Sequence, residues 1–197
     1  QMLNRKRFIQ QAAMSAGAML AGPSIMESAS YFNPLKITIL HTNDTHSRLE
    51  PFPMDGSRNQ GLGGIASRGK LISKIRNEEE NVLLLDAGDI FQGTPYFNIY
   101  KGEPEIKAMT SLGYDATTIG NHDFDAGMES LATQLTRHAN FPMLVCKYDF
   151  TGTAMENKTQ PYKIFKKQKL KIGVFGIGIE PKGLIPENLF GVMKYLD

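Results

Sequence analysis

The sequence predicts an α/β fold, a layered sandwich built on a mostly parallel sheet. Short apolar runs typical of strands alternate along the chain with segments in which apolar residues recur at helical spacing. One run, residues 82–86, is apolar up to its final Asp86, as in strands buried on both faces of a parallel sheet. With 41% hydrophobic and 21% charged residues, the 197-residue chain has enough apolar material for one packed domain.

The expected strands and helices alternate in chain order. Strands are expected at residues 36–41, 82–86, 115–119 and 143–146, where apolar and β-branched residues gather. Helices are expected at residues 64–79, 103–112 and 128–138. The first helix has apolar residues at helical spacing, at Ile65, Leu71, Ile72 and Ile75. The second has Pro104 in its first turn, a position that favours proline.

The last part of the chain is expected to form a β-hairpin. Residues 162–166 and 170–177 have the pattern of two strands joined by a tight polar turn near Lys167 and Gln168. The longest segment without expected secondary structure, residues 42–62, directly follows the first strand. Long loops in compact domains are usually functional or mobile, so this loop is a candidate for part of a site.

Residues 1–30 have the composition of an export signal. Basic Arg5, Lys6 and Arg7 precede a stretch rich in Ala, Gly, Met and Ser. The stretch resembles a twin-arginine signal, but Lys6 separates the two arginines, so a Sec or lipoprotein route stays open, as does an amphipathic helix or membrane anchor. We expect an exported protein, periplasmic or at the cell surface, with no stable membrane span. The domain that follows is expected at residues 31–197.

Charge and cysteine content exclude several classes of site. The formal net charge is +2, with basic residues concentrated at the N-terminus and in residues 163–171, so the sequence predicts no nucleic-acid partner. A single cysteine, Cys146, excludes an internal disulfide and is expected to pack inside a strand. Any metal must therefore rely on His, Asp, Glu and Asn ligands.

Polar clusters follow the first three expected strands. Ligands of open α/β sheets bind beyond the carboxyl ends of the strands, so these clusters are the candidates for chemistry. They are His-Thr-Asn-Asp-Thr-His at residues 41–46, Asp-Ala-Gly-Asp at residues 86–89 and Gly-Asn-His-Asp-Phe-Asp at residues 120–125.

The residue types in these clusters suit divalent cations. Asp44 and His46 are two residues apart, so an extended backbone would point both side chains to the same side. Gly88 allows a sharp turn before Asp89, whose carboxylate can bridge two ions. Asn121 offers a neutral amide oxygen. A mixture of carboxylate, imidazole and amide ligands favours borderline divalent metals.

The three motifs in this order resemble the calcineurin-like metallophosphoesterases. The segments Ile-Leu-His-Thr-Asn-Asp-Thr-His at 39–46, Leu-Asp-Ala-Gly-Asp-Ile-Phe-Gln-Gly-Thr at 85–94 and Ile-Gly-Asn-His-Asp-Phe-Asp at 119–125 resemble its 5'-nucleotidase and 2',3'-cyclic phosphodiesterase branch. The resemblance runs from about residue 35 to the end. It implies the N-terminal part of an αββα-type catalytic domain. The family completes its site with histidines from later loops, so we expect this chain alone to bind metal weakly and hydrolyse little.

The resemblance also implies a reaction and residue roles. The reaction is two-metal hydrolysis of phosphate monoesters, most simply of nucleoside 5'-monophosphates, with 2',3'-cyclic nucleotides as further substrates. The cofactors are two divalent ions, Zn, Mn, Fe or Co, expected about 3.5–4 Å apart. Asp44 and His46 would hold the first ion, Asp89 would bridge, and Asn121 would belong to the second.

For catalysis, the resemblance implies that His122 acts on the substrate and that Asp125 orients it, with Asn121 and His122 contacting the phosphoryl group. Two other functions stay open: an exported sulfur-oxidation hydrolase of the same branch, and an inactive metal-binding module left by truncation.

Several residues have a simpler structural interpretation. His41 is expected to be structural and His138 a solvated helix residue. Residues 61–64 mostly serve a turn, with a phosphate cradle as the alternative. Three aromatic residues near strand ends are expected in the core rather than stacked on a base: Phe91, Phe97 and Phe124.

Overall fold

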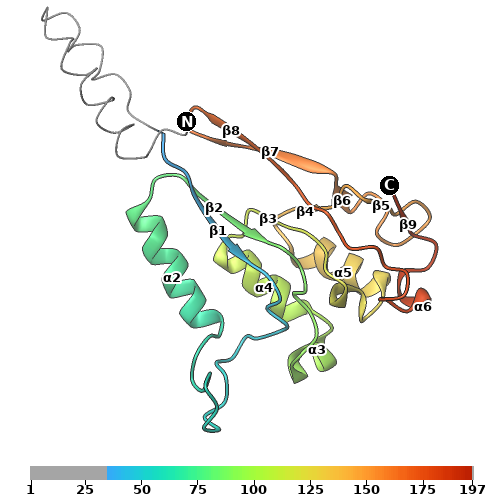
Figure 1. Cartoon of the computed structure of the whole chain (residues 1–197), viewed down its shortest axis with the longest axis horizontal. Coiled ribbons are helices and arrows are strands. Elements are labelled where there is room, and N and C mark those ends of the chain that lie inside the picture. Colours follow the sequence, from blue (N-terminus) through green and yellow to red (C-terminus); the bar gives the residue numbers. More distant parts are fainter. Residues whose placement is uncertain (1–34, 197) are drawn as a thin grey trace, which may run out of the picture. The chain divides into compact units, whose positions relative to one another are not determined.

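A five-stranded parallel sheet carries the fold (Figure 1). The computed structural model describes residues 35–196, so the predicted export signal at residues 1–30 lies outside the described residues. The strands stand in the order β1-β2-β3-β4-β6. Their bounds are Thr38–Thr42 (β1), Val82–Asp86 (β2), Ala116–Thr117 (β3), Met143–Leu144 (β4) and Thr159–Gln160 (β6).

Helices cover one face of this sheet (Figure 1). They are α2 (Ile65–Glu78), α3 (Pro95–Tyr100), α4 (Glu103–Leu112) and α5 (Met128–His138). Leu84 of β2 points to this side and packs in one cluster with Ile72 of α2, Ile106 of α4 and Leu131 of α5. Burial of such side chains contributes about 1.5–3 kcal/mol each, so this cluster fixes the helices against the strands.

An antiparallel hairpin covers part of the other face. It consists of β7 (Tyr162–Lys167) and β8 (Leu170–Phe175). Leu83, the neighbour of Leu84 in β2, points to this side and packs against Phe165 of the hairpin and Leu144 of β4. Leu83 and Leu84 are therefore both buried, as expected for a strand with a layer on each face.

The remaining elements are short. A second small sheet pairs β5 (Tyr148–Asp149) with β9 (Lys194–Tyr195) in antiparallel fashion. A 3-10 turn, η2 (His122–Phe124), follows β3, and a one-turn helix, α6 (Glu187–Phe190), lies near the end of the described chain.

The α/β fold with a mostly parallel sheet is confirmed, and so are the hairpin and the strand at 82–86. The helices predicted at 103–112 and 128–138 have those bounds, and the first helix is shorter by one residue at each end. The strands predicted at 115–119 and 143–146 are wrong in length, because each forms a ladder over only two residues. Cys146 consequently lies beyond β4, where its N–H donates to the carbonyl of Gly176 at 2.9 Å.

Within residues 35–196, none of the helices combines the length and the apolar character that crossing a membrane requires.

Candidate metal centre

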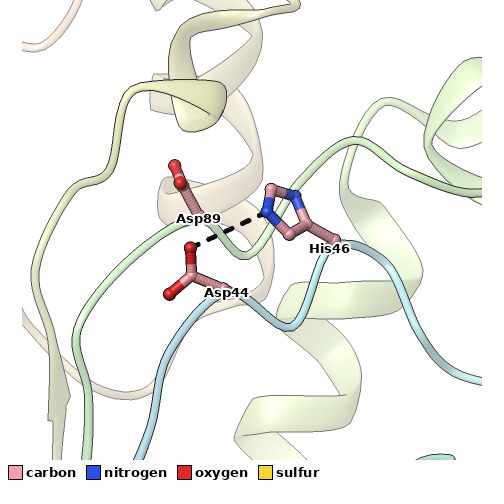
Figure 2. A group of neighbouring side chains, drawn as sticks. All are labelled: Asp44, His46 and Asp89. Atoms are coloured by element: carbon pink, nitrogen blue, oxygen red, sulfur yellow. Dashed lines mark ion pairs between the residues drawn. The ribbon is translucent and has the colours of Figure 1, made fainter.

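Three of the predicted ligands come together beyond the carboxyl ends of β1 and β2 (Figure 2). Asp44 and His46 follow β1, and Asp89 follows β2. Each contributes one ligand atom, and these atoms all lie within 4.8 Å of one another. Asp44 Oδ1 and His46 Nε2 are 3.8 Å apart. Two carboxylates and an imidazole at this separation can share one divalent cation.

The backbone brings these side chains together in a different way from the one predicted. Asp44, His46 and Asp89 have φ angles of 50°, 45° and 55°, so each is left-handed rather than extended. The extended geometry expected for Asp44 and His46 is therefore wrong. Left-handed backbone costs a non-glycine residue about 1–2 kcal/mol. Three such residues in one cluster indicate a conformation that its surroundings impose.

Hydrogen bonds between the two loops impose this conformation. The N–H of Asp44 donates to the carbonyl of Gly88 at 3.0 Å, and the N–H of His46 donates to the carbonyl of Asp89, also at 3.0 Å. Gly88 has the positive φ, 93°, that the sharp turn before Asp89 was predicted to need. The loop after β1 is thus hydrogen-bonded to the loop after β2, which fixes Asp44 and His46 relative to Asp89.

His46 is held in the tautomer that a metal ligand needs. Its Nδ1 lies 3.1 Å from the carbonyl oxygen of Phe91. Because a carbonyl can only accept a hydrogen bond, Nδ1 carries a proton, and in the neutral imidazole the lone pair is therefore on Nε2. That lone pair is on the ring atom nearest Asp44. In metal-binding histidines, the ring nitrogen that does not bind the metal typically donates its N–H to a carbonyl or carboxylate oxygen.

The loop after β3 places His122 beside this group. The N–H of His122 donates to Asp89 Oδ1 at 2.8 Å, and the rings of His122 and His46 lie edge to face with centroids 5.2 Å apart. Asn121 is the residue that precedes η2 in the same turn. The three predicted clusters therefore converge at one edge of the sheet.

His122 and Asp125 form the predicted pair. His122 Nδ1 and Asp125 Oδ2 are 2.9 Å apart. This hydrogen bond is the largest influence on the imidazole and raises the pKa of His122 above its ordinary value, while partial burial acts in the opposite direction. The pair therefore favours a protonated His122 whose Nε2–H is free to donate.

Asp123 supports the site in a way that sequence reasoning missed. Its carboxylate is 1% exposed and accepts four backbone N–H groups. Three belong to the loop after β2, from Asp89, Ile90 and Phe91 at 3.1, 2.9 and 3.2 Å, and the fourth belongs to Gly120 at 2.8 Å. Asp123 therefore joins the loops after β2 and β3. The sequence offered one signal for this role. Asp123 lies between His122 and Phe124, so that acidic residues stand on both sides of the buried Phe124.

Asp86 also connects neighbouring segments, at the end of the strands that carry the site. Its carboxylate accepts hydrogen bonds from the hydroxyls of Thr42 at 2.5 Å and Thr117 at 3.0 Å, and from the N–H of Gly88 at 2.9 Å. Burial raises the pKa of the Asp86 carboxyl, and these hydrogen bonds lower it. The three strands that carry the site are thus joined through one side chain.

The simpler structural interpretations are mostly confirmed. The three aromatic residues expected in the core are buried, with exposed fractions of 1%, 3% and 0%: Phe91, Phe97 and Phe124. His41 is exposed on β1 and is not part of the Asp44 group. Residues 61–64 follow on from a turn that ends at Gly61 and lead to Gly64, the N-cap of α2. His138 is half-buried at the end of α5 rather than fully solvated, and its carbonyl accepts a hydrogen bond from the Thr110 hydroxyl.

Comparisons with known proteins agree with this geometry. The family model for calcineurin-like phosphoesterases matches residues 37–176. The chain is 43% identical over 147 residues to snake venom 5'-nucleotidase of Gloydius brevicauda, covering 72% of this chain and 25% of that protein. It is 40% identical over 148 residues to 5'-nucleotidase of Homo sapiens, covering 72% and 26%.

A solved structure has the same fold. The crystal structure of a 5'-nucleotidase precursor from Thermus thermophilus superposes with a TM-score of 0.72 at 32% identity, covering 82% of this chain and 32% of that chain. The chain spans about a quarter of the length of the curated relatives it matches.

Proposed function

The chain belongs to the calcineurin-like phosphoesterase family, and from that premise we propose that it hydrolyses phosphate monoesters in a metal-dependent reaction, with nucleoside 5'-monophosphates as substrates. The observation that carries the proposal is the convergence of Asp44, His46 and Asp89 next to the His122–Asp125 pair. The relatives named 5'-nucleotidases support the choice of substrate. Cyclic 2',3'-nucleotides are a further substrate class of the same proposal.

The residues fit divalent cations. Asp44 and Asp89 can supply carboxylate oxygens and His46 can supply Nε2. To this set we assign the neutral amide oxygen of Asn121. We assign two ions to this set, with Zn, Mn, Fe and Co all compatible with its mixture of nitrogen and oxygen donors. When bound, such cations neutralise charge on the phosphoryl group and lower the pKa of the attacking water.

His122 and Asn121 act on the substrate itself. A water oxygen forms a bond to phosphorus, the ester P–O bond breaks, and the leaving oxygen takes a proton. The protonated His122, held by Asp125 through Nδ1, presents its Nε2–H to that leaving oxygen. The Asn121 amide can direct its N–H groups to a phosphoryl oxygen. The products are a nucleoside and inorganic phosphate.

We also propose that the protein is exported, and this proposal does not depend on the proposed reaction. It rests on the pattern of residues 1–30, with basic residues followed by a stretch of small and apolar residues. Substrates would then be nucleotides outside the cytoplasm.

The test of the reaction is phosphate release from AMP by the 197-residue chain, with Mn²⁺ or Zn²⁺ and with a chelator. We expect slow release, and only with metal. Asp89→Asn should lower both the bound metal and the rate, because one anionic ligand is lost. His122→Asn should slow release by about 10²–10⁴-fold and leave the metal content unchanged.

Two outcomes would contradict the proposal. Phosphate release that persists with chelator, or that Asp89→Asn leaves unchanged, would exclude a metal-dependent reaction at this site. Metal binding without release from any phosphate ester would favour the inactive metal-binding module, and turnover of a sulfur ester alone would favour the sulfur-oxidation hydrolase.

A further inference from the structure

A cavity of about 470 Å³ opens directly beside Asp44 and His46. It is also lined by Arg48, Arg68, Gly63 and Gly64. The metal-dependent reaction described above assigns no role to this cavity or to the two arginines. The space is large enough for a chemical group beyond the phosphoryl group that the metals would hold.

The two guanidinium groups give the cavity a positive charge. Within residues 35–196, neither Arg48 nor Arg68 is in an ion pair with a carboxylate. Arg48 lies over the ring of Phe52, with its Cζ 4.4 Å from the ring centroid, and its guanidinium carries a planar fork of N–H donors. Such a fork of donors matches the oxygens of phosphate and carboxylate groups.

The helix that carries Arg68 adds to this charge. Helix α2 is 14 residues long, begins at the cavity after Gly64, and has no acidic residue in its first turn. The positive end of its dipole is therefore uncompensated by a side chain of the helix. The one carboxylate that lines the cavity is Asp44, which already belongs to the candidate metal group.

We propose that this cavity is an anion subsite in which Arg48 and Arg68 bind a second anionic group of the substrate. The inference rests on the proposed function and narrows its class of substrates. The favoured substrates are phosphate esters whose leaving group carries another phosphate, such as nucleoside bisphosphates. The scissile phosphoryl group lies at Asp44, His46 and Asp89, and the second phosphate lies at the arginines, where charge-assisted hydrogen bonds hold it.

Internal groups compete for the arginines: the Asp86 carboxylate and the Tyr114 hydroxyl interact with Arg68, and Glu105 lies near both guanidinium groups. The carboxylate of Glu105 is 3% exposed, has no hydrogen-bond partner among the described residues, and borders a water-sized cavity that Arg48 and Arg68 also border. If Glu105 permanently paired with these guanidinium groups, they could not bind a ligand. The experiment must therefore observe the arginines directly.

The first experiment needs neither metal nor turnover. The Nε–H resonances of the arginines are followed by NMR while inorganic phosphate is added to the 197-residue chain in the presence of a chelator. We expect the Arg48 and Arg68 signals to shift together and saturate. The signals of exposed Arg58, and of Arg76, which donates to the carbonyls of Leu112 and Gly113, should stay in place. Unchanged Arg48 and Arg68 signals would overturn the proposal, even in a chain that hydrolyses AMP.

The second experiment compares substrates in the metal-loaded chain. The ratio of KM for adenosine 3',5'-bisphosphate to KM for AMP is measured in the wild type and in Arg48→Gln and Arg68→Gln. We expect each substitution to raise this ratio about 10-fold or more, because a charge-assisted contact to the second phosphate is lost. Arg58→Gln, in the same loop but outside the cavity, is the matched control. Equal ratios in all four proteins would overturn the subsite and leave the phosphatase function standing.

Discussion

The protonation of His122 depends mainly on one carboxylate. Asp125 accepts from His122 Nδ1 at 2.9 Å and is the main reason that the pKa of His122 is raised. A proton on His122 is therefore favoured at a higher pH than in an isolated imidazole. Because the folded pKa exceeds the unfolded one, the pair stabilises the fold below the unfolded pKa, and this contribution is lost as the pH rises through the folded pKa. The His122 side chain is 40% exposed, so solvent screening keeps that contribution small.

Replacing Asp125 tests this dependence directly. In Asp125→Asn the charge that stabilises the imidazolium is lost, so the pKa of His122 should fall toward its ordinary value. The measurement is an NMR titration of the four histidines in metal-free protein, with Asp55→Asn in the exposed loop as the control. A His122 pKa that is the same in the wild type and Asp125→Asn would show that Asp125 does not govern its protonation.

The residue scale also shows where sequence reasoning about the site succeeded and where it did not. The order of polar residues after the strands correctly predicted that Asp44, His46 and Asp89 lie together, because parallel strands bring their carboxyl ends to one edge. The left-handed backbone of Asp44 and His46 could not be foreseen, because it is imposed by hydrogen bonds to the loop after β2, which is distant along the chain. Asp123 was missed for the same reason, since its partners lie in that other loop.

At the element scale, the loops after β2 and β3 approach so closely that only glycine fits. A Cβ on Gly88 would lie 2.4 Å from the backbone nitrogen of Gly120, and Gly88 also has a φ of 93°. Gly183 has a comparable φ of 79° but open space around its Cβ position. Comparing alanine substitutions at Gly88 and Gly183 therefore distinguishes the cost of a left-handed backbone from the cost of a steric conflict.

We predict that Gly88→Ala destabilises the fold more than Gly183→Ala does. In Gly183→Ala the cost is that of a left-handed alanine, about 1–2 kcal/mol. In Gly88→Ala the loops must also move apart, which breaks the hydrogen bonds around Asp89 and lowers metal affinity. Urea denaturation measures the stabilities and metal titration measures the affinity. Equal destabilisation by both substitutions would mean that the loops tolerate the added methyl group.

Elements differ in how far the sequence predicts them. Helices α4 and α5 and strand β2 were predicted at their observed bounds because their apolar periodicity extends over the whole element. Strands β3 and β4 were predicted too long, because their apolar residues continue into loops that are buried without pairing in a ladder. Helix α3 was missed, since its six residues include three aromatics and give no helical period. Strand β6 was missed because two residues show no pattern.

In the molecule as a whole, the β7–β8 hairpin is a separate two-stranded layer that packs on the parallel sheet through a small apolar cluster. Among the described strands, β7 and β8 pair only with each other, and their outward side chains include Ile164 and Phe175 at 54% and 63% exposure. The hairpin is held to the sheet by the apolar contact of Phe165, with Ile172 and Val174 beside it, and at its turn by polar contacts of Lys167 with Asp115 and of Gln168 with Glu80. An isolated two-stranded hairpin is marginally stable in water, so this apolar contact decides whether it stays ordered.

We therefore predict that the hairpin opens at a lower free energy than the parallel sheet. In hydrogen exchange, amides of β7 and β8 should exchange faster than those of Leu83 and Leu84 in β2. Phe165→Ala removes the main contact and should speed hairpin exchange about 10-fold or more, with β2 little changed, whereas Ile164→Ala on the outward face should have little effect. If Phe165→Ala instead speeds exchange equally in the hairpin and in β2, the layers unfold together, and the hairpin is an integral part of one cooperative core.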